Sequence, residues 1–205
     1  MTFQGNPQPF IAVAGNIGAG KSGLVQRLAA TLELDALPEL TEANPYFGRF
    51  YAQPSTWAFR SQVAFALDSL RRHLQSLNSG PVVQDRTVYE TIEVFSRILH
   101  QEGHLSALEM GLLSSFSEIA GSLPRQPTLL VYLDAPTSVL LERISIRARP
   151  GESDLTGEYL DRLREAYDRF VSIWDRSPVI KVDTARTDLR SDAGLAQLLS
   201  LLNLS

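Results

Sequence analysis

The sequence predicts an α/β fold in which a five-stranded parallel sheet is covered by helices on both faces. Short apolar stretches alternate with segments whose apolar residues recur at helical spacing, which is the pattern of strands joined by crossover helices. The stretch 128–134 is apolar along nearly its whole length, as expected for a strand covered on both faces. The 205 residues suffice for one full core, so we expect a single domain spanning 1–205.

The first strand is predicted at 10–14 and the first helix at 22–32. Between them the sequence reads glycine, four residues, then Gly-Lys-Ser. A glycine-rich turn before a helix directs backbone N–H groups and the positive end of the helix dipole toward one point, which favours phosphate. In this motif Lys21 reaches the β- and γ-phosphates, and the hydroxyl of Ser22 holds Mg²⁺. We therefore expect a nucleoside triphosphate to bind a loop formed by Gly15, Asn16, Ile17, Gly18, Ala19, Gly20, Lys21 and Ser22.

Further strands and helices continue this alternation along the chain. Short apolar runs predict the other strands at 35–40, 81–85, 128–134 and 178–182. Helical spacing, together with Pro54 in a first turn, predicts helices at 46–51, 54–77, 87–99, 105–123, 136–146, 158–174 and 189–202. The polar stretch 147–156 contains Pro150-Gly151 and is predicted to be a loop.

Composition limits the classes of partner. The net charge of −4 disfavours a nucleic-acid partner, because binding to the phosphate backbone needs a basic surface. The absence of cysteine excludes disulfides, thiolate zinc sites and cysteine nucleophiles, and is compatible with the cytoplasm, where we expect the protein. No stretch approaches the length of a membrane span, so no membrane partner is expected. His73, His100 and His104 lack metal-ligand spacing and are expected at the surface.

Acidic residues occur at the predicted ends of two strands. Ligands of parallel sheets bind beyond the carboxyl ends of the strands, so Glu39 and Asp85 should share one cleft with the phosphate loop. Asp85 is a candidate for holding Mg²⁺, and Glu39 for orienting or deprotonating a nucleophile. Arg86 should point into the same cleft. The alternatives are that Asp85 caps the next helix, that Arg86 forms a surface salt bridge, and that Glu39 is simply solvated.

Three arginines form a basic run where a predicted helix meets the polar loop. Arg143 and Arg147 are one turn apart and share a face, and Arg149 follows. Such a group can close over a triphosphate and neutralise charge in the transition state. The alternative is that the helix dipole alone favours cations at a helix C-terminus.

These residues together resemble the deoxyribonucleoside kinases over nearly the whole chain. The resemblance rests on the phosphate loop, the acidic segment 38–45 that ends in Asn-Pro, and Asp85-Arg86-Thr87. The resemblance implies a P-loop kinase fold, places the catalytic base on Glu39, ties Asp85 to Mg²⁺, and ties Arg86 to the 5′-oxygen and the catalytic acid. Glu42 is a less favoured base, considered because Leu40 replaces a proline that often follows the family's acid.

The same resemblance assigns the nucleoside pocket. Tyr51 is similar to the tyrosine that contacts the sugar 3′-hydroxyl, Gln62 to the glutamine that pairs with the base edge, and Phe95 to the phenylalanine that stacks on the base. Arg143, Arg147 and Arg149 match the lid arginines in a lid near 143–156, and Glu152 matches the lid acid that also reaches the 3′-hydroxyl. Without the resemblance, Tyr51 and Phe95 are equally consistent with core packing, and Gln62 with a bond to the backbone.

The chain departs from the family pattern at two positions near the base. Ser69 stands where many members carry an arginine, and Thr91 stands where several carry an aspartate. In the family's purine and cytosine kinases, that arginine and that aspartate form a charged network near the base. Without these two side chains the pocket is more open, and the sequence does not fix which base is preferred. Asp68, Glu90 or Glu93 are nearby candidates to replace the charged network.

The resemblance implies ATP-dependent phosphorylation of the 5′-hydroxyl of a deoxyribonucleoside, and we expect a purine deoxyribonucleoside. It also implies ATP and Mg²⁺ as cofactors. The expected assembly is a homodimer or a heterodimer with a related kinase. The alternatives are a pyrimidine or multisubstrate kinase, a thymidylate-type nucleoside monophosphate kinase, and a regulatory P-loop subunit of a paired kinase. A carboxylate at Glu39 favours a hydroxyl acceptor over a phosphate acceptor. A GTP-binding switch is disfavoured because the sequence has no Asn-Lys-x-Asp motif.

Overall fold

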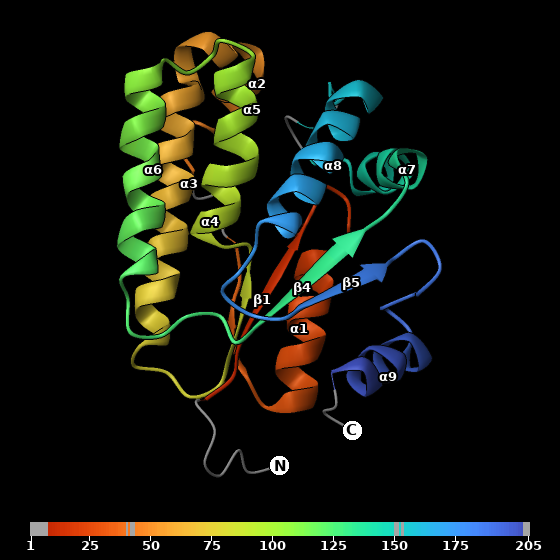
Figure 1. Cartoon of the computed structure of the whole chain (residues 1–205). Helices are drawn as coiled ribbons and strands as arrows, with labels where there is room; N and C mark the ends of the chain where they lie inside the picture. Colours follow the sequence, from red (N-terminus) through yellow and green to blue (C-terminus); the bar gives the residue numbers. More distant parts are fainter. Residues whose placement is uncertain (1–7, 40, 42–43, 150–151, 153, 203–205) are drawn as a thin grey trace.

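The computed structural model describes residues 8–39, 41, 44–149, 152 and 154–202. Their strands form one sheet in which every pairing is parallel, confirming the predicted five-stranded sheet. In spatial order the strands are β2 (Asp35–Leu37), β3 (Val82–Asp85), β1 (Phe10–Gly15), β4 (Leu129–Asp134) and β5 (Val179–Asp183). All strand ends that were predicted to carry the site therefore meet at one edge of the sheet (Figure 1).

Helices cover the sheet on both sides. Figure 1 shows α1 and α9 on one side and the group from α3 to α6 on the other. The helical segments are α1 (Lys21–Leu32), α2 (Phe47–Ala52), α3 (Pro54–Ser76), α4 (Val88–Glu90), the π-helical turn η2 (Thr91–Ser96), α5 (Arg97–Gln101), α6 (Ala107–Gly121), α7 (Thr137–Arg147), α8 (Gly157–Ser172) and α9 (Asp192–Leu201). Among the described residues, no helix combines the length and apolar character needed to cross a membrane.

Local capping explains several helix boundaries. The hydroxyl of Ser106 accepts a hydrogen bond from the backbone of Glu109, whose side chain accepts one from the backbone of Ser106 in return. This capping box starts α6 two residues later than the predicted 105–123. Thr87 caps α4 in the same way by accepting from the backbone of Glu90. The alternative in which Asp85 caps this helix is therefore wrong.

Two predicted elements differ in ways that affect the site. The strand predicted at 35–40 ends at Leu37, so Glu39 lies two residues beyond the sheet rather than at its edge. The helix predicted at 87–99 contains the π-helical turn η2, which adds one residue to a turn. The hydroxyl of Ser96 lies 3.0 Å from the carbonyl oxygen of Thr91 in this turn. Such turns are frequent at functional sites, and this one carries Phe95.

The prediction that His73 lies at the surface is wrong. Its side chain is buried on the inner face of α3, with its ring edge-on to Phe10 at 5.2 Å between centroids. Nε2 lies 2.6 Å from the carbonyl oxygen of Arg125, which requires the tautomer that donates from this nitrogen. A lone histidine with no metal-ligand spacing gives no sign of burial in the sequence, because the face it lies on is decided by how α3 packs.

The burial of His73 predicts a pH-dependent loss of stability. Burial lowers the pKa of His73 below 6.5, and the nearby Arg125 and Arg176 charges add to this effect, although the bond to the Arg125 carbonyl opposes it. The unfolded chain therefore binds the proton more readily, and the free energy of unfolding should fall as pH drops below about 6.5. Urea unfolding of the wild type and His73→Gln measures this. The stability advantage of the wild type should shrink toward acid pH, and a pH-independent difference would contradict the assignment.

Candidate active site

A cavity of about 290 Å³ opens at the carboxyl ends of the strands. It brings together most of the residues that the sequence assigned to the site, from segments far apart in the chain. Gly15, Asn16, Ala19, Asp85 and Arg143 do not line it. The predicted residues on its wall are Ile17, Gly18, Gly20, Lys21, Ser22, Glu39, Tyr51, Gln62, Arg86, Phe95, Arg147, Arg149 and Glu152.

The phosphate loop is held by contacts beneath it. A Cβ at Gly15 would lie 2.5 Å from the carbonyl oxygen of Leu133, so only glycine allows β1 and β4 to approach this closely. Gly20 precedes α1 with φ 95°, in the left-handed region. Asn16 donates from Nδ2 to the carbonyl of Leu160 in α8 at 2.9 Å, and its Oδ1 accepts from the loop backbone at Ile17. Contacts within the protein therefore fix the shape of the loop.

Lys21 is buried at the start of α1. Its Nζ donates to the carbonyl oxygens of Gly15 at 2.8 Å and Asn16 at 3.0 Å. Burial and the nearby Arg86 charge lower the pKa of Lys21 to about 8, although Asp85, Glu90 and Glu39 oppose the shift. The amine is therefore still mostly protonated at pH 7, as binding to phosphate requires.

Asp85 and Ser22 form the pair to which the sequence assigned Mg²⁺. The hydroxyl of Ser22 donates to Oδ2 of Asp85 at 2.6 Å, and the carboxylate is fully buried at the end of β3. No described residue donates a hydrogen bond to Oδ1 of Asp85. A hydroxyl and an orphaned carboxylate oxygen fit a hard cation that prefers oxygen ligands. The described residues contain no group of three or more acidic, histidine or cysteine side chains that could hold a metal ion.

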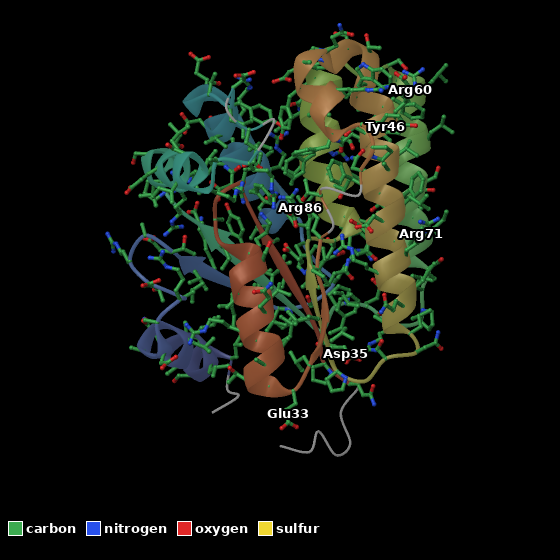
Figure 2. All side chains as sticks on the ribbon, turned by 180° about the vertical axis from the view of Figure 1, so that it is seen from behind. Glu33, Asp35, Tyr46, Arg60, Arg71 and Arg86 are labelled. Carbon is green, nitrogen blue, oxygen red and sulfur yellow. The ribbon has the colours of Figure 1, made fainter. Side chains whose placement is uncertain are left out.

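Arg86, which Figure 2 shows near the middle of the molecule, forms ion pairs with two acidic side chains. Its Nη1 lies 3.3 Å from Oε1 of Glu39, and its Nε lies 3.0 Å from Oε1 of Glu90. The guanidinium also lies 4.4 Å from the ring centroid of Phe95. The pair is largely buried, with side-chain exposures of 11% for Arg86 and 12% for Glu39, so the alternative of a surface salt bridge is wrong.

The electrostatics of this group keep Glu39 in its basic form. Burial alone raises the pKa of Glu39, but the charges of Arg86, Lys21 and Arg72 outweigh it and lower the pKa below 4.5. Thr41 donates a hydrogen bond to Oε2 of Glu39 at 3.4 Å and acts in the same direction. The carboxylate is therefore ionised at neutral pH, and the alternative of a merely solvated loop residue does not fit its surroundings.

Part of the cavity wall is aromatic. Phe95 and Tyr51 line it, and Gln62 is 3% exposed, with Oε1 accepting from the hydroxyl of Ser96 at 3.2 Å. At the two positions that depart from the family pattern, Thr91 lines the cavity and Ser69 does not. Neither Ser69 nor Thr91 therefore supplies the charged side chain that family members carry at these positions near the base.

The lid residues divide into two groups. Arg147 donates to Oε2 of Glu152 at 2.5 Å, and Arg149 lies 3.7 Å from Oε1 of the same carboxylate. Arg143 instead donates to Thr184 Oγ1 at 2.9 Å and to its carbonyl at 2.7 Å, in the loop after β5. Helix α7 ends at Arg147, and Ala148 turns the chain with φ 48°. The shared helical face of Arg143 and Arg147 therefore does not bring both side chains into the cavity.

Some residues predicted for the site lie outside the described part of the chain, and some residues that contribute to the site were not predicted. Residues 42, 150, 151 and 153, which include the alternative base Glu42 and part of the lid, are outside the description. Glu90 is fully buried, accepts a hydrogen bond from the hydroxyl of Tyr167, and has its pKa raised by burial despite the charge of Arg86. Arg86 lies before the helix that carries Glu90 and has φ 61°, so helical spacing does not predict this pair. The sequence named Glu90 only as a candidate to replace the charged network near the base. Unpredicted residues on the cavity wall are Gly23, Thr41, Phe47, Phe50, Phe65 and Tyr159.

Comparison with known proteins identifies relatives along most of the chain. The model of the family described as deoxynucleoside kinase matches residues 11–197. A deoxyadenosine kinase of Dictyostelium discoideum is 34% identical over 84% of this chain and 71% of its own length. A deoxyadenosine/deoxycytidine kinase of Bacillus subtilis is 29% identical over 89% and 85%, and a deoxyguanosine kinase of Lactobacillus johnsonii is 31% identical over 87% and 83%.

Solved structures share the fold. The deoxyadenosine kinase from M. mycoides with the products dCMP and dCDP bound superposes with a TM-score of 0.82 at 24% identity, covering 95% of this chain and 98% of that one. The same protein with bound dATP gives a TM-score of 0.80 at 24% identity, covering 95% and 99%. These matches confirm the P-loop kinase fold expected from the sequence.

Proposed function

This chain belongs to the deoxynucleoside kinase family, and from that premise we propose that it transfers the γ-phosphate of ATP to the 5′-hydroxyl of a purine deoxyribonucleoside. One observation carries this proposal. The ionised carboxylate of Glu39, held by Arg86 at 3.3 Å, shares a cavity with the phosphate loop. A carboxylate facing a triphosphate site suits an acceptor that must lose a proton, and it repels an acceptor that is already a phosphate.

In the proposed reaction the 5′-oxygen forms a bond to the γ-phosphorus while the bond from that phosphorus to the β,γ-bridging oxygen breaks, which releases ADP. The proton of the 5′-hydroxyl passes to Glu39. Lys21, Arg86 and the lid arginines Arg147 and Arg149 stabilise the charge on the transferring group. Ser22 and Asp85 would hold Mg²⁺, which when bound neutralises charge on the β- and γ-phosphates.

The acceptor wall supports a nucleoside. An amide at Gln62 and rings at Phe95 and Tyr51 offer hydrogen bonds to a base edge and an aromatic surface for stacking. Glu152 lies beside the lid arginines, so the segment 143–156 acts as the lid that brings Arg147 and Arg149 to the phosphates. The purine assignment follows the deoxyadenosine and deoxyguanosine kinases among the relatives.

A competition assay tests the proposal. The purified protein with ATP and Mg²⁺ is offered the four deoxynucleosides, adenosine and thymidine monophosphate, and the products are separated by chromatography. We expect the highest kcat/KM with deoxyadenosine or deoxyguanosine. Preference for deoxycytidine or thymidine would overturn the purine assignment. Faster phosphorylation of the monophosphate would establish the thymidylate-type alternative, and ATP binding without any product would establish the regulatory subunit.

We further propose that a second copy of the chain, or a related kinase, covers the outer face of α3 and α6. These two helices lie side by side (Figure 1) and expose an apolar surface made by Leu67, Leu74, Leu108, Leu112 and Ile119. Light scattering after size exclusion should give twice the chain mass for the wild type. Leu112→Glu should give the mass of one chain, whereas Leu201→Glu, in the exposed part of α9, should stay dimeric. A monomeric wild type would overturn the homodimer.

A further inference from the structure

A buried arginine lies outside the residues that line the cavity. Arg72 belongs to α3, and its side chain is 7% exposed. Its Nη1 donates to three backbone carbonyl oxygens, those of Asp85 at 2.5 Å, Leu37 at 3.3 Å and Arg86 at 3.3 Å. Its only role described so far is the contribution of its charge to the lowered pKa of Glu39.

These three carbonyls mark the places where the chain leaves the sheet toward the site. Leu37 is the last residue of β2, two residues before Glu39. Asp85 is the last residue of β3, directly before Arg86. Because β2 and β3 are neighbours in the sheet, one guanidinium fixes the relative position of the two exits that carry Glu39 and Arg86.

The backbone of Arg86 needs such support. Its φ of 61° lies in the left-handed region, which is unfavourable for a residue with a side chain. Conformations of this kind persist where the surrounding structure over-determines them. The carbonyl of Arg86 accepts from Nε2 of the buried Gln84 at 3.0 Å as well as from Arg72, so two side chains hold the same strained peptide.

The chemistry of the contact requires an arginine. A guanidinium is planar and carries five N–H donors, so it can donate in several directions at once. Besides the carbonyls, Arg72 donates to the hydroxyl of Ser69 at 3.1 Å and to Asp68 at 2.9 Å. Asp68, one helical turn before Arg72, balances its charge, and the Asp68 carboxylate is 31% exposed. The carbonyl contacts therefore do not depend on an active-site carboxylate as counter-ion.

We propose that Arg72 is a positioning residue for phosphoryl transfer, which holds the Asp85-Arg86 corner so that the Arg86 side chain meets Glu39. This inference rests on the proposed function, because it acts through the roles given there to Arg86 and Glu39. A displacement of about 1 Å in a catalytic group can reduce turnover 100-fold. Loss of the Arg72 contacts is therefore expected to lower kcat while leaving the phosphate loop and its affinity for ATP in place.

The test compares Arg72→Met with Arg169→Met. Arg169 is exposed in the last turn of α8, outside both the cavity wall and the proposed contact face of α3 and α6, so it controls for the loss of one arginine charge. Arg72→Met should lower kcat roughly 10- to 100-fold, with the Kd for ATP within about twofold of the wild type. Arg169→Met should match the wild type. Without any ligand, the amides of 85–87 should exchange hydrogen faster in Arg72→Met only.

A double-mutant cycle distinguishes positioning from general damage. If Arg72 acts through Arg86, then Arg72→Met should have little further effect on kcat in an Arg86→Met background. Arg72→Lys keeps the positive charge but loses the planar set of five N–H donors, so it should fold and still show most of the loss in kcat. If Arg72→Met does not fold, the kcat of Arg72→Lys tests the proposal in its place.

Three outcomes would overturn the proposal. These are an unchanged kcat in Arg72→Met or Arg72→Lys, an equal loss in both backgrounds of the cycle, or unchanged amide exchange at 85–87. In each of them the wild type and Arg169→Met remain active, so the proposed function stands. A wild type that binds ATP and phosphorylates no deoxynucleoside would instead contradict the proposed function, and the role of Arg72 would fall with it.

Discussion

Replacement of Glu39 by glutamine should lower kcat by roughly 10²- to 10⁴-fold, the range for loss of a general base. The amide keeps the size of the side chain and an oxygen that can accept from Arg86, now 3.3 Å from Oε1. It cannot accept the proton of the 5′-hydroxyl. Because the pKa of Glu39 is lowered by Arg86 and Lys21 against the effect of burial, the wild-type carboxylate is already in its basic form at neutral pH.

The measurement is steady-state turnover together with calorimetric titration of ATP. Glu39→Gln should fold and bind ATP like the wild type. Glu33→Gln makes the same chemical change at the exposed end of α1, at the bottom of the molecule and well below Arg86 in Figure 2, and should leave kcat unchanged. Near-normal turnover of Glu39→Gln would remove Glu39 from the mechanism.

Replacement of Arg86 by methionine should damage stability and turnover together. It leaves Glu39 and the fully buried Glu90 without their shared cation, and removal of one partner from a buried pair typically costs about 3–5 kcal/mol. Proton uptake by Glu90, whose pKa is already raised by burial against the charge of Arg86, limits the loss. Turnover should fall because the transferring group loses a positive charge and Glu39 loses its anchor.

The pH dependence of this variant gives a sharper test. Without Arg86, the folded-state pKa values of both carboxyls should lie above their unfolded values. The protonated forms then favour folding at acid pH, and this support is lost as pH rises through the folded pKa. Denaturant unfolding should therefore show a smaller deficit near pH 5 than near pH 8. Arg86→Lys, which keeps one charge, should be intermediate, and a deficit that does not vary with pH would contradict the buried triad.

The parts of the site that the sequence predicts are those specified by short segments. The phosphate loop is encoded in eight consecutive residues, and the meeting of Glu39 with Arg86 follows from parallel strands ending at one edge. Arg72 and His73 could not be assigned this way, because a polar residue on a long helix reads as solvent-exposed until the packing of α3 is known. Arg143 shows the converse, since a shared helical face does not fix where a side chain binds beyond the helix end.

The π-helical turn η2 divides the segment 88–101 into two registers. One extra residue rotates everything after it by about 100° relative to an uninterrupted α-helix. Ile92 near the start of the turn and Ile98 after it are both buried in the core, while Phe95 within the turn lines the cavity. The position of Phe95 on the cavity wall is therefore set by this change of register as much as by residue identity. Deleting one residue from 91–94, before Phe95, would restore a continuous helix and rotate Phe95 away without altering a single aromatic side chain.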